Sequence, residues 1–451
     1  MSQFLPSRTV RMIVLLVLLA GLAGRGALAE VFNPETFTLD NGMEVVVIEN
    51  HRAPVVTHMV WYRVGAMDEP PDRSGLAHYL EHLMFKGTDT LEPGEFSAIV
   101  KRNGGQENAF TGQDYTGYWQ SVAVDRLETV MRIEADRMVN LTLTAEEIEP
   151  ERGVILEERN SRIESSPGAI LGESVNTAFY QNHPYRIPII GWEDEIVGLS
   201  LEDIRSFYRD WYSPNNAILV IAGDITADQV RPLAEKYYGV IPARPLPERV
   251  VWHEPAPRAD QRVVYRDQRV RQPSWSRRYS APSFFVGATE HAYPLEVLAE
   301  VLGGGSTTRL YRSLVVEQGI AVNAGAYFGA GRRGPGTFGF YASPKPGVEM
   351  AEIEAAVERE IQKLVADGIT QQELDEAVVR MQDAAIFARD SLQGPAQVLG
   401  AALAIGRTVE DVESWPERIG AVTLDDVNAA IEAVFDGKPT VTSELLPKGT
   451  T

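Results

Sequence analysis

Two histidines and a glutamate stand close together at His78, Glu81 and His82, in the order H-x-x-E-H. On a helix these positions are three and four residues apart, so both imidazoles and the carboxylate share one face. Two imidazoles one turn apart can bind a single divalent metal ion through their ring nitrogens. The carboxylate between them can accept a proton from a water molecule activated by that metal. The spacing therefore indicates a hydrolytic metal site.

The alternative interpretation is an amphipathic helix whose histidines are ordinary surface or core residues. The order is the inverse of the commoner H-E-x-x-H zinc motif. In a chain with seven histidines, a chance match is on the order of one per cent, so we favour the metal site. The other five histidines are scattered and form no second helical pair: His51, His58, His183, His253 and His291.

A catalytic zinc ion needs a third protein ligand and keeps one position open for water. The chain has no cysteine, so that ligand must be His, Asp or Glu. A helix predicted to begin at Thr144 offers several glutamates, of which Glu151 and Glu158 lie two turns apart on one face. Spacing alone does not choose among them, because an acidic helix face is usually only solvated. The candidates are Glu146, Glu147, Glu149, Glu151, Glu157 and Glu158.

We predict a mixture of strands and helices around these residues. Alternating apolar residues indicate strands at 37–49, folded over a turn at 40–42, and at 55–64 and 106–124. Strands and helices do not alternate strictly, so we predict an α+β fold rather than a doubly wound sheet.

Capping signals mark the predicted helices. Ser74 can cap a helix that runs to about Lys86 and carries the histidine pair. Capping-box spacing also occurs at Asp125 with Glu128 and at Thr144 with Glu147.

A proline-rich segment at residues 241–260 divides the chain into two halves. The second half repeats the order of elements of the first, and residues 143–148 resemble residues 369–374. We predict two homologous domains, 30–240 and 261–451. Each is expected to be a mainly antiparallel sheet packed with helices, and the two face each other as half of a clamshell. Aligning the repeats places Ala377 and Ala384 where the first half has Glu151 and Glu158, so the second domain is expected to lack a metal site.

The first 29 residues predict a signal peptide. Arg8 and Arg11 precede an apolar run from Met12 to Gly24, which leads into the cleavage pattern ending at Ala29. The run is shorter than the ~20 residues that span a bilayer, and it is not amphipathic like a mitochondrial presequence. We expect cleavage after Ala29 and export, to the periplasm if the source is bacterial, with no membrane span left. Secretion or an N-terminal membrane anchor is the alternative.

Composition narrows the classes of function. The 451 residues carry a formal net charge of −21, which argues against nucleic acid or an anionic membrane surface as the main partner. The absence of cysteine excludes disulfides and thiolate nucleophiles. With 44% hydrophobic and 23% charged residues, the chain is typical of globular proteins.

These features together resemble the pitrilysin, insulysin and mitochondrial processing peptidase family of zinc metallopeptidases, in its short bacterial two-domain form. The resemblance covers essentially the whole mature chain. It rests on residues 75–88 (GLAHYLEHLMFKGT), 108–111 (NAFT) and 151–158 (ERGVILEE). The first string is highly specific, and the other two add order and spacing.

The resemblance implies one zinc ion per chain and hydrolysis of short or unfolded peptides. It assigns the metal ligands as His78, His82 and Glu158, with Glu81 as general base and Glu151 as a supporting residue. It also implies that a substrate backbone is bound by strand addition along Asn108, Ala109 and Phe110. Zinc itself rests on the resemblance, since other divalent ions accept two histidines and a carboxylate.

One departure from the family bears on partners. Active members carry an Arg and a Tyr seven positions apart in the second domain, which grip the bound peptide. Here the expected places after Leu314 hold Val315 and Val322, and nearby Arg312 and Tyr327 do not have the spacing. We therefore predict a homologous partner chain that supplies the pair, or otherwise a homodimer. The rival functions are a non-catalytic scaffold of the same fold and a zinc-storage module, which would not need Glu81.

Overall fold

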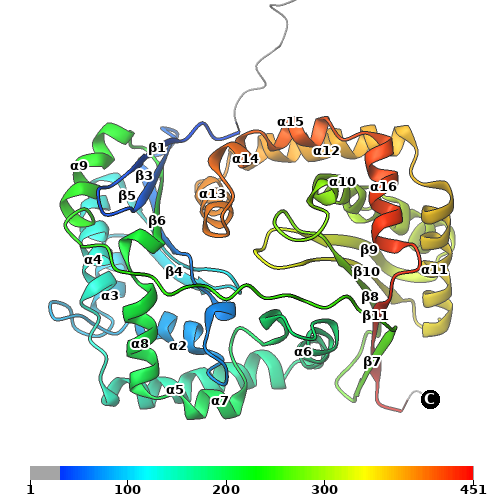
Figure 1. Cartoon of the computed structure of the whole chain (residues 1–451), viewed down its shortest axis with the longest axis horizontal. Coiled ribbons are helices and arrows are strands. Elements are labelled where there is room, and N and C mark those ends of the chain that lie inside the picture. Colours follow the sequence, from blue (N-terminus) through cyan, green and yellow to red (C-terminus); the bar gives the residue numbers. More distant parts are fainter. Residues whose placement is uncertain (1–30, 450–451) are drawn as a thin grey trace, which may run out of the picture.

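The computed structural model describes residues 31–449, so the predicted signal peptide lies outside the described residues. Two β-sheets stand at opposite sides of the molecule, with helices around and between them (Figure 1). The strand orders are β1-β2-β6-β3-β5-β4 and β7-β11-β8-β10-β9. The β2–β6 and β7–β11 pairs are parallel, and the other neighbours are antiparallel. The predicted α+β fold with two mainly antiparallel sheets is confirmed.

The first sheet includes the strands that the sequence predicted around the turn at residues 40–42 and between residues 106 and 124. Its strands are β1 Glu35–Thr38, β2 Glu44–Glu49, β3 Val55–Tyr62, β4 Gln106–Thr111, β5 Thr116–Ala123 and β6 Ala217–Gly223. The helices of this half are α2 Leu76–Leu83, α3 Glu95–Arg102, α4 Leu127–Val139, α5 Ala145–Arg159, α6 Pro167–Phe179, α7 Glu193–Gly198, α8 Leu201–Trp211 and α9 Ala227–Tyr237.

The second sheet follows the proline-rich segment at 241–260, which contains neither a helix nor a strand. Its strands are β7 Gln261–Asp267, β8 Ser274–Ala281, β9 Ala321–Gly329, β10 Gly336–Pro344 and β11 Thr440–Pro447. The helices of this half are α10 Ala292–Gly303, α11 Met350–Asp367, α12 Gln371–Ala388, α13 Gly394–Ala404, α14 Val409–Glu413, α15 Trp415–Gly420 and α16 Leu424–Phe435. No described helix is both long and apolar enough to cross a membrane.

The two halves exchange helices. The central strand β6 is buried along its whole length, because its alternate residues belong to two different cores on opposite faces of the sheet. Helices of the first half cover one face, and α13 from the second half covers the other, where Leu399 packs in one cluster with Trp61 and Val220. A strand that is apolar on both faces needs a cover on each side.

The exchange is reciprocal and close. Helix α6 of the first half packs against β7 and β11 of the second sheet, with Leu171 and Val175 beside Val441. On the other side, a Cβ atom at Gly400 of α13 would lie 2.1 Å from Nε1 of Trp61, so only glycine permits this approach. The sequence did not predict either crossing.

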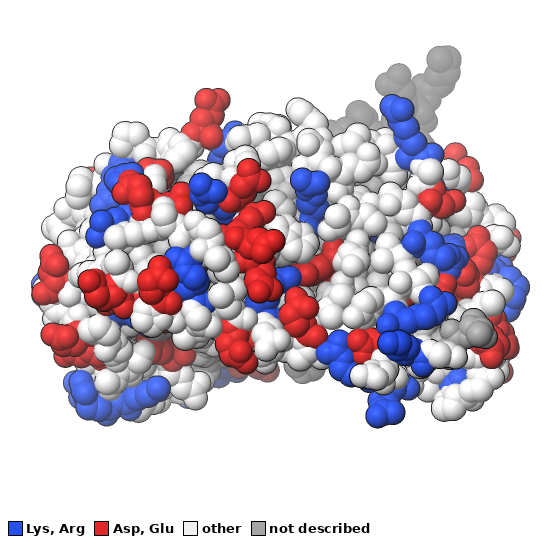
Figure 2. Space-filling view, turned by 90° about the horizontal axis from the view of Figure 1, so that it is seen from below, with Lys and Arg blue, Asp and Glu red and all other residues white. Residues whose placement is uncertain are grey.

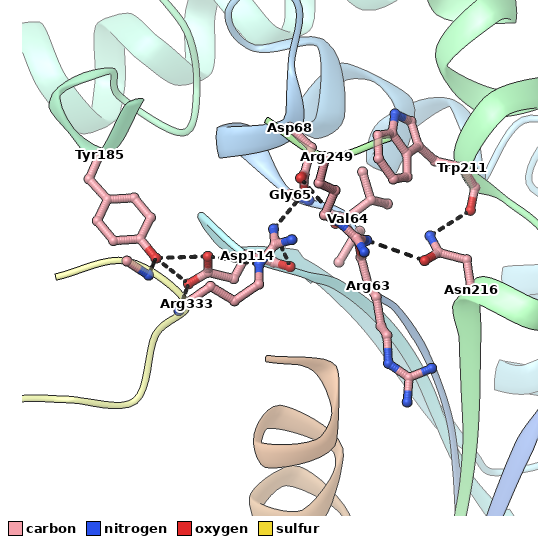
Figure 3. A network of polar contacts seen from close by, with 12 residues as sticks. Arg63, Val64, Gly65, Asp68, Asp114, Tyr185, Trp211, Asn216, Arg249 and Arg333 are labelled. Carbon is pink, nitrogen blue, oxygen red and sulfur yellow. Dashed lines mark hydrogen bonds and ion pairs between the residues drawn. The ribbon is translucent and has the colours of Figure 1, made fainter. Parts of the chain in front are cut away.

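Polar contacts join the tips of the β4–β5 and β9–β10 hairpins, which meet between the two sheets (Figure 3). Arg333 pairs with Asp68 at 2.6 Å and with Asp114 at 3.2 Å. The Tyr185 hydroxyl donates to Asp114 at 2.8 Å and accepts from the amide of Gly334 at 2.9 Å. Both aspartate side chains are 4% exposed, and a buried carboxylate requires such a partner. The ion pairs therefore fix the two halves relative to each other.

The helix that carries the histidine pair begins differently from the prediction. Ser74 does not cap it. The cap position is Gly75, with φ at 84°, and the Glu69 carboxylate accepts from the amides of Gly75 and Ala77 at 3.0 and 2.8 Å. The Ser74 hydroxyl instead accepts from the amide of Trp192. A carboxylate from an earlier loop satisfies the first amides of the helix better than a hydroxyl next to it.

Two other capping predictions are also wrong in detail. Helix α4 begins at Leu127, after Asp125, and has no side-chain cap. Thr144 does precede α5, but its hydroxyl makes no capping hydrogen bond.

Truncating α13 at its contact with the first sheet should destabilise the whole chain. Leu399 is fully buried, and Leu399→Ala is expected to lower the free energy of unfolding by about 2–5 kcal/mol. Val398, its neighbour on the same helix, is 44% exposed, so Val398→Ala should cost about 0.5 kcal/mol or less. Urea unfolding of the two variants measures the difference. Equal losses would contradict the helix exchange.

Candidate metal centre

Helices α2 and α5 lie side by side, and their contact brings the predicted ligands together. Nε2 of His82 lies 3.1 Å from Oε2 of Glu158, and Nε2 of His78 lies 3.6 Å from the same oxygen. Ligand atoms of the three residues all lie within 4.8 Å of one another. Over residues 31–449, no second group of His, Asp or Glu side chains is arranged in this way.

The donor atoms are suited to a metal ion. Oε2 of Glu158, the oxygen nearest both imidazoles, is buried and has no hydrogen-bond partner in the protein. Burial, together with the charges of His82 and Arg162, lowers the pKa of His78 to about 3. The imidazole is therefore neutral at physiological pH, which is the form that coordinates a metal. Two imidazoles and one carboxylate match the donor set of catalytic zinc sites.

Glu151 orients His82. Its Oε1 atom lies 2.8 Å from Nδ1 of His82, which places the imidazole proton on Nδ1 and leaves the Nε2 lone pair facing Glu158. Its other carboxylate oxygen pairs with Lys86. The hydrogen bond with His82 and the pairing with Lys86 lower the pKa of Glu151 to about 2, although burial opposes them. Burial would also lower the pKa of His82, but Glu151 and Glu158 outweigh it and raise that pKa.

Glu81 faces the edge strand β4. The Thr111 hydroxyl donates to Oε2 of Glu81 at 2.5 Å. Burial raises the pKa of Glu81, and the hydrogen bond from Thr111 and the charge of His82 oppose that rise. A carboxylate whose pKa is raised is better placed to hold a proton during a reaction cycle. Sequence reasoning did not single out Thr111 as a partner of Glu81.

The predicted substrate strand lies next to this cluster. β4 is the last strand of its sheet, and β5 is its neighbour on one side only. Asn108 is exposed, and Ala109 is half-buried. The ring of Phe110 packs against Trp61 and Tyr115, at ring-centre distances of 4.9 and 6.2 Å. Its side chain therefore belongs to the core under α13, and the open edge of the strand is left for a peptide backbone.

The remaining candidates are separated from the cluster. Glu146, Glu149 and Glu157 are exposed on α5, as expected of a solvated acidic face. In the second half, Ala377 and Ala384 lie on α12 and offer no ligand atom.

Two further charged residues support the site and were not predicted. Lys86 holds Glu151, and Arg162 holds Oε1 of Glu158 at 2.9 Å. The sequence signal that could have identified them is helical spacing, because Lys86 is four residues after His82 and Arg162 is four residues after Glu158.

The two-domain α+β fold and the His-Glu cluster on adjoining helices define the class of two-domain metallopeptidase folds. Residues 44–193 match the family described as "Insulinase (Peptidase family M16)", and residues 198–381 match "Peptidase M16 inactive domain". The chain belongs to the M16 peptidase family, which confirms the resemblance seen in the sequence.

Named relatives agree with this assignment. The zinc protease PqqE of Helicobacter pylori is 33% identical over 347 residues, which cover 76% of this chain and 77% of that protein. An uncharacterized zinc protease of Bacillus subtilis, YmxG, is 25% identical over 404 residues, which cover 88% and 95%. The crystal structure of a protease from Helicobacter pylori superposes with a TM-score of 0.84 at 28% identity, covering 92% of this chain and 99% of that one.

Substitutions in α5 should lower metal affinity in a graded way. Glu158→Gln removes a candidate ligand, and Glu151→Gln removes the support of His82, a loss that typically costs about 10–100-fold in affinity. We expect one zinc ion per chain, weaker binding in Glu151→Gln and the weakest in Glu158→Gln. Titration against a zinc-chelating dye measures the affinities. Glu157→Gln, an exposed neighbour, is the control, and an equal effect there would contradict the assignment.

Proposed function

We propose that the chain is a zinc metalloendopeptidase that cleaves short or unfolded peptides, as the catalytic member of a two-chain enzyme. The observation that carries the proposal is the convergence of His78, His82 and Glu158 beside Glu81 and an open strand edge. The relatives named zinc proteases support the same activity.

Each side chain of the site would have its own role in the reaction. His78, His82 and Glu158 would hold the zinc ion, which when bound supplies a Lewis acid that polarises a carbonyl and lowers the pKa of water. Glu81 would accept a proton from the attacking water and deliver it to the leaving amine. Thr111 holds one oxygen of Glu81, which leaves the other free for that transfer. The edge of β4 would align the peptide backbone by strand addition.

The proposal of a partner chain rests on two positions in the second half. Val315 lies in a π-helical turn over Tyr311–Glu317, and Val322 is exposed on the edge strand β9. These are the places where the family's Arg and Tyr would stand, and neither side chain can make a hydrogen bond. A homologous chain that carries the pair would complete the site.

The non-catalytic scaffold is the weaker alternative, because the cluster on α2 and α5 is complete. Export through the first 29 residues remains part of the proposal.

Replacing the general base should separate catalysis from metal binding. Glu81→Gln is expected to reduce turnover of a quenched fluorescent peptide library by about 10²–10⁴-fold and to leave the zinc content unchanged. The control is Glu157→Gln, which should keep both. A Glu81→Gln variant that retains full turnover would refute the peptidase mechanism, and loss of zinc in that variant would assign Glu81 a structural role.

The need for a partner can be tested on the same substrates. The purified chain alone should turn over slowly, and addition of a homologous chain that carries the Arg and Tyr pair should raise the rate. Introducing the pair in cis, as Val315→Arg with Val322→Tyr, should raise the rate of the single chain. Ordinary turnover by the unmodified chain alone would remove the reason for a partner.

A further inference from the structure

A cavity of about 460 Å³ lies where the two hairpin tips meet, and we call it the junction pocket. Both halves of the chain line it, so it exists only because the halves are held together. The lining residues used below are Gln113 and Asp114 from the β4–β5 turn, Asn176 of α6, Tyr180 after α6, Arg278 of β8 and Arg332 of the β9–β10 turn.

Two arginines in this pocket have no carboxylate partner among residues 31–449. Arg332 donates to the Tyr180 hydroxyl at 3.0 Å and lies 5.3 Å from the ring centre of Tyr185. Arg278 donates to Oδ1 of Asn176 at 2.7 Å, and its Nε atom is buried without a hydrogen-bond partner. A guanidinium carries five N–H donors, so both side chains keep unused donors toward the cavity.

The lack of a carboxylate partner for these two arginines does not come from a shortage of acidic residues. Acidic residues outnumber Lys and Arg by 63 to 42, and on the face shown in Figure 2 the two kinds are interspersed. Carboxylates are therefore abundant, yet none contacts Arg278 or Arg332 in the part of the chain that is described. The planar guanidinium group binds carboxylate or phosphate through two parallel hydrogen bonds, so two half-buried guanidinium groups without a counter-ion suit an anionic ligand.

The one carboxylate in the pocket is already engaged. Asp114 is bound by Arg333 and by the Tyr185 hydroxyl (Figure 3). Asp68 pairs with Arg333 at 2.6 Å and with Arg249 at 3.4 Å, so two arginines face the two aspartates. The hairpin-tip ion pairs thus balance their own charges, and Arg278 and Arg332 leave the junction pocket positive.

The β4–β5 turn links the junction pocket to the candidate metal centre along the chain. Gln113, in its wall, is two residues beyond Thr111, whose hydroxyl contacts Glu81. A peptide aligned along β4 would therefore run past the catalytic carboxylate toward the pocket.

We propose that the junction pocket binds a carboxylate of the peptide substrate through Arg278 and Arg332. The inference rests on the proposed peptidase function, because it names the peptides that the site prefers. The carboxylate is either the free C-terminus of the peptide or an Asp or Glu side chain. In both cases, two guanidinium groups hold one anionic group beside the substrate strand.

A measurement of peptide binding tests the junction-pocket proposal without relying on cleavage. The mature chain with Glu81→Gln is titrated with a fluorescent alanine-rich peptide in three forms: a free C-terminal carboxylate, a C-terminal amide, and an amide with one Asp near the end. We expect the amide to bind about tenfold to a hundredfold more weakly than the preferred form. Preference for the free acid identifies the C-terminus, and rescue by Asp identifies a side chain.

The variants Arg278→Gln and Arg332→Gln should abolish this discrimination, and Arg332→Lys should keep part of it. Arg359→Gln is the matched control, because Arg359 is exposed on α11, lies outside the junction pocket and, among residues 31–449, bonds to the Gln318 side chain and to no carboxylate. Thermal unfolding shows whether each variant is folded. Equal affinity for the three peptides, or discrimination that survives both Gln variants, would overturn the proposal.

Cleavage by the unmodified chain is measured in parallel, so that the two proposals can fail separately. Carboxylate-dependent binding without any cleavage would refute the peptidase and leave the pocket assignment standing. Cleavage without a preference for carboxylates would refute the pocket assignment alone.

Discussion

The fold depends on the reciprocal packing of α6 and α13 across the two halves. β3 and β6 are buried on both faces, so the helices of the first half cannot bury the sheet by themselves. α13 supplies the missing cover, and α6 does the same for β7 and β11. The exchange places the two sheets on opposite sides of a shared centre. It also explains why the hairpin tips meet and why buried ion pairs form there.

The candidate metal centre depends on a second contact, between α2 and α5. The Tyr79 hydroxyl donates to the backbone carbonyl of Ile148 at 2.5 Å, and Glu69 holds the amino end of α2. These bonds set the position of one helix relative to the other. Glu151 then aligns His82, and Arg162 aligns Glu158. Two of the three candidate ligands, His82 and Glu158, are thus held by a neighbour outside the cluster, which pre-orients their donor atoms.

The two halves share an architecture and differ in chemistry. The first carries the candidate metal ligands, the proposed general base and the open strand edge. The second repeats the order of elements without a metal cluster among its described residues, but it contributes α13 over β3 and β6 and the arginines of the β9–β10 turn and β8. The matched family descriptions reflect the same asymmetry, since one is a peptidase domain and the other an inactive domain.

The sequence by itself determined what depends on neighbours along the chain. Helical geometry fixes the relation of residues three and four positions apart, so His78, Glu81 and His82 could be placed on one face. Alternation revealed the strands, and the repeated order of elements revealed two halves. The choice of Glu158 among six glutamates came from the family resemblance and not from spacing.

Only the tertiary structure decided the contacts between distant segments. It brought Glu158 against the histidines, Thr111 against Glu81 and Glu69 to the start of α2, where Ser74 was expected. It also crossed α6 and α13 between the halves and joined two hairpins around a pocket. Local backbone geometry carries no information on such pairings, because they are set by how buried surfaces are covered and how buried charges are paired.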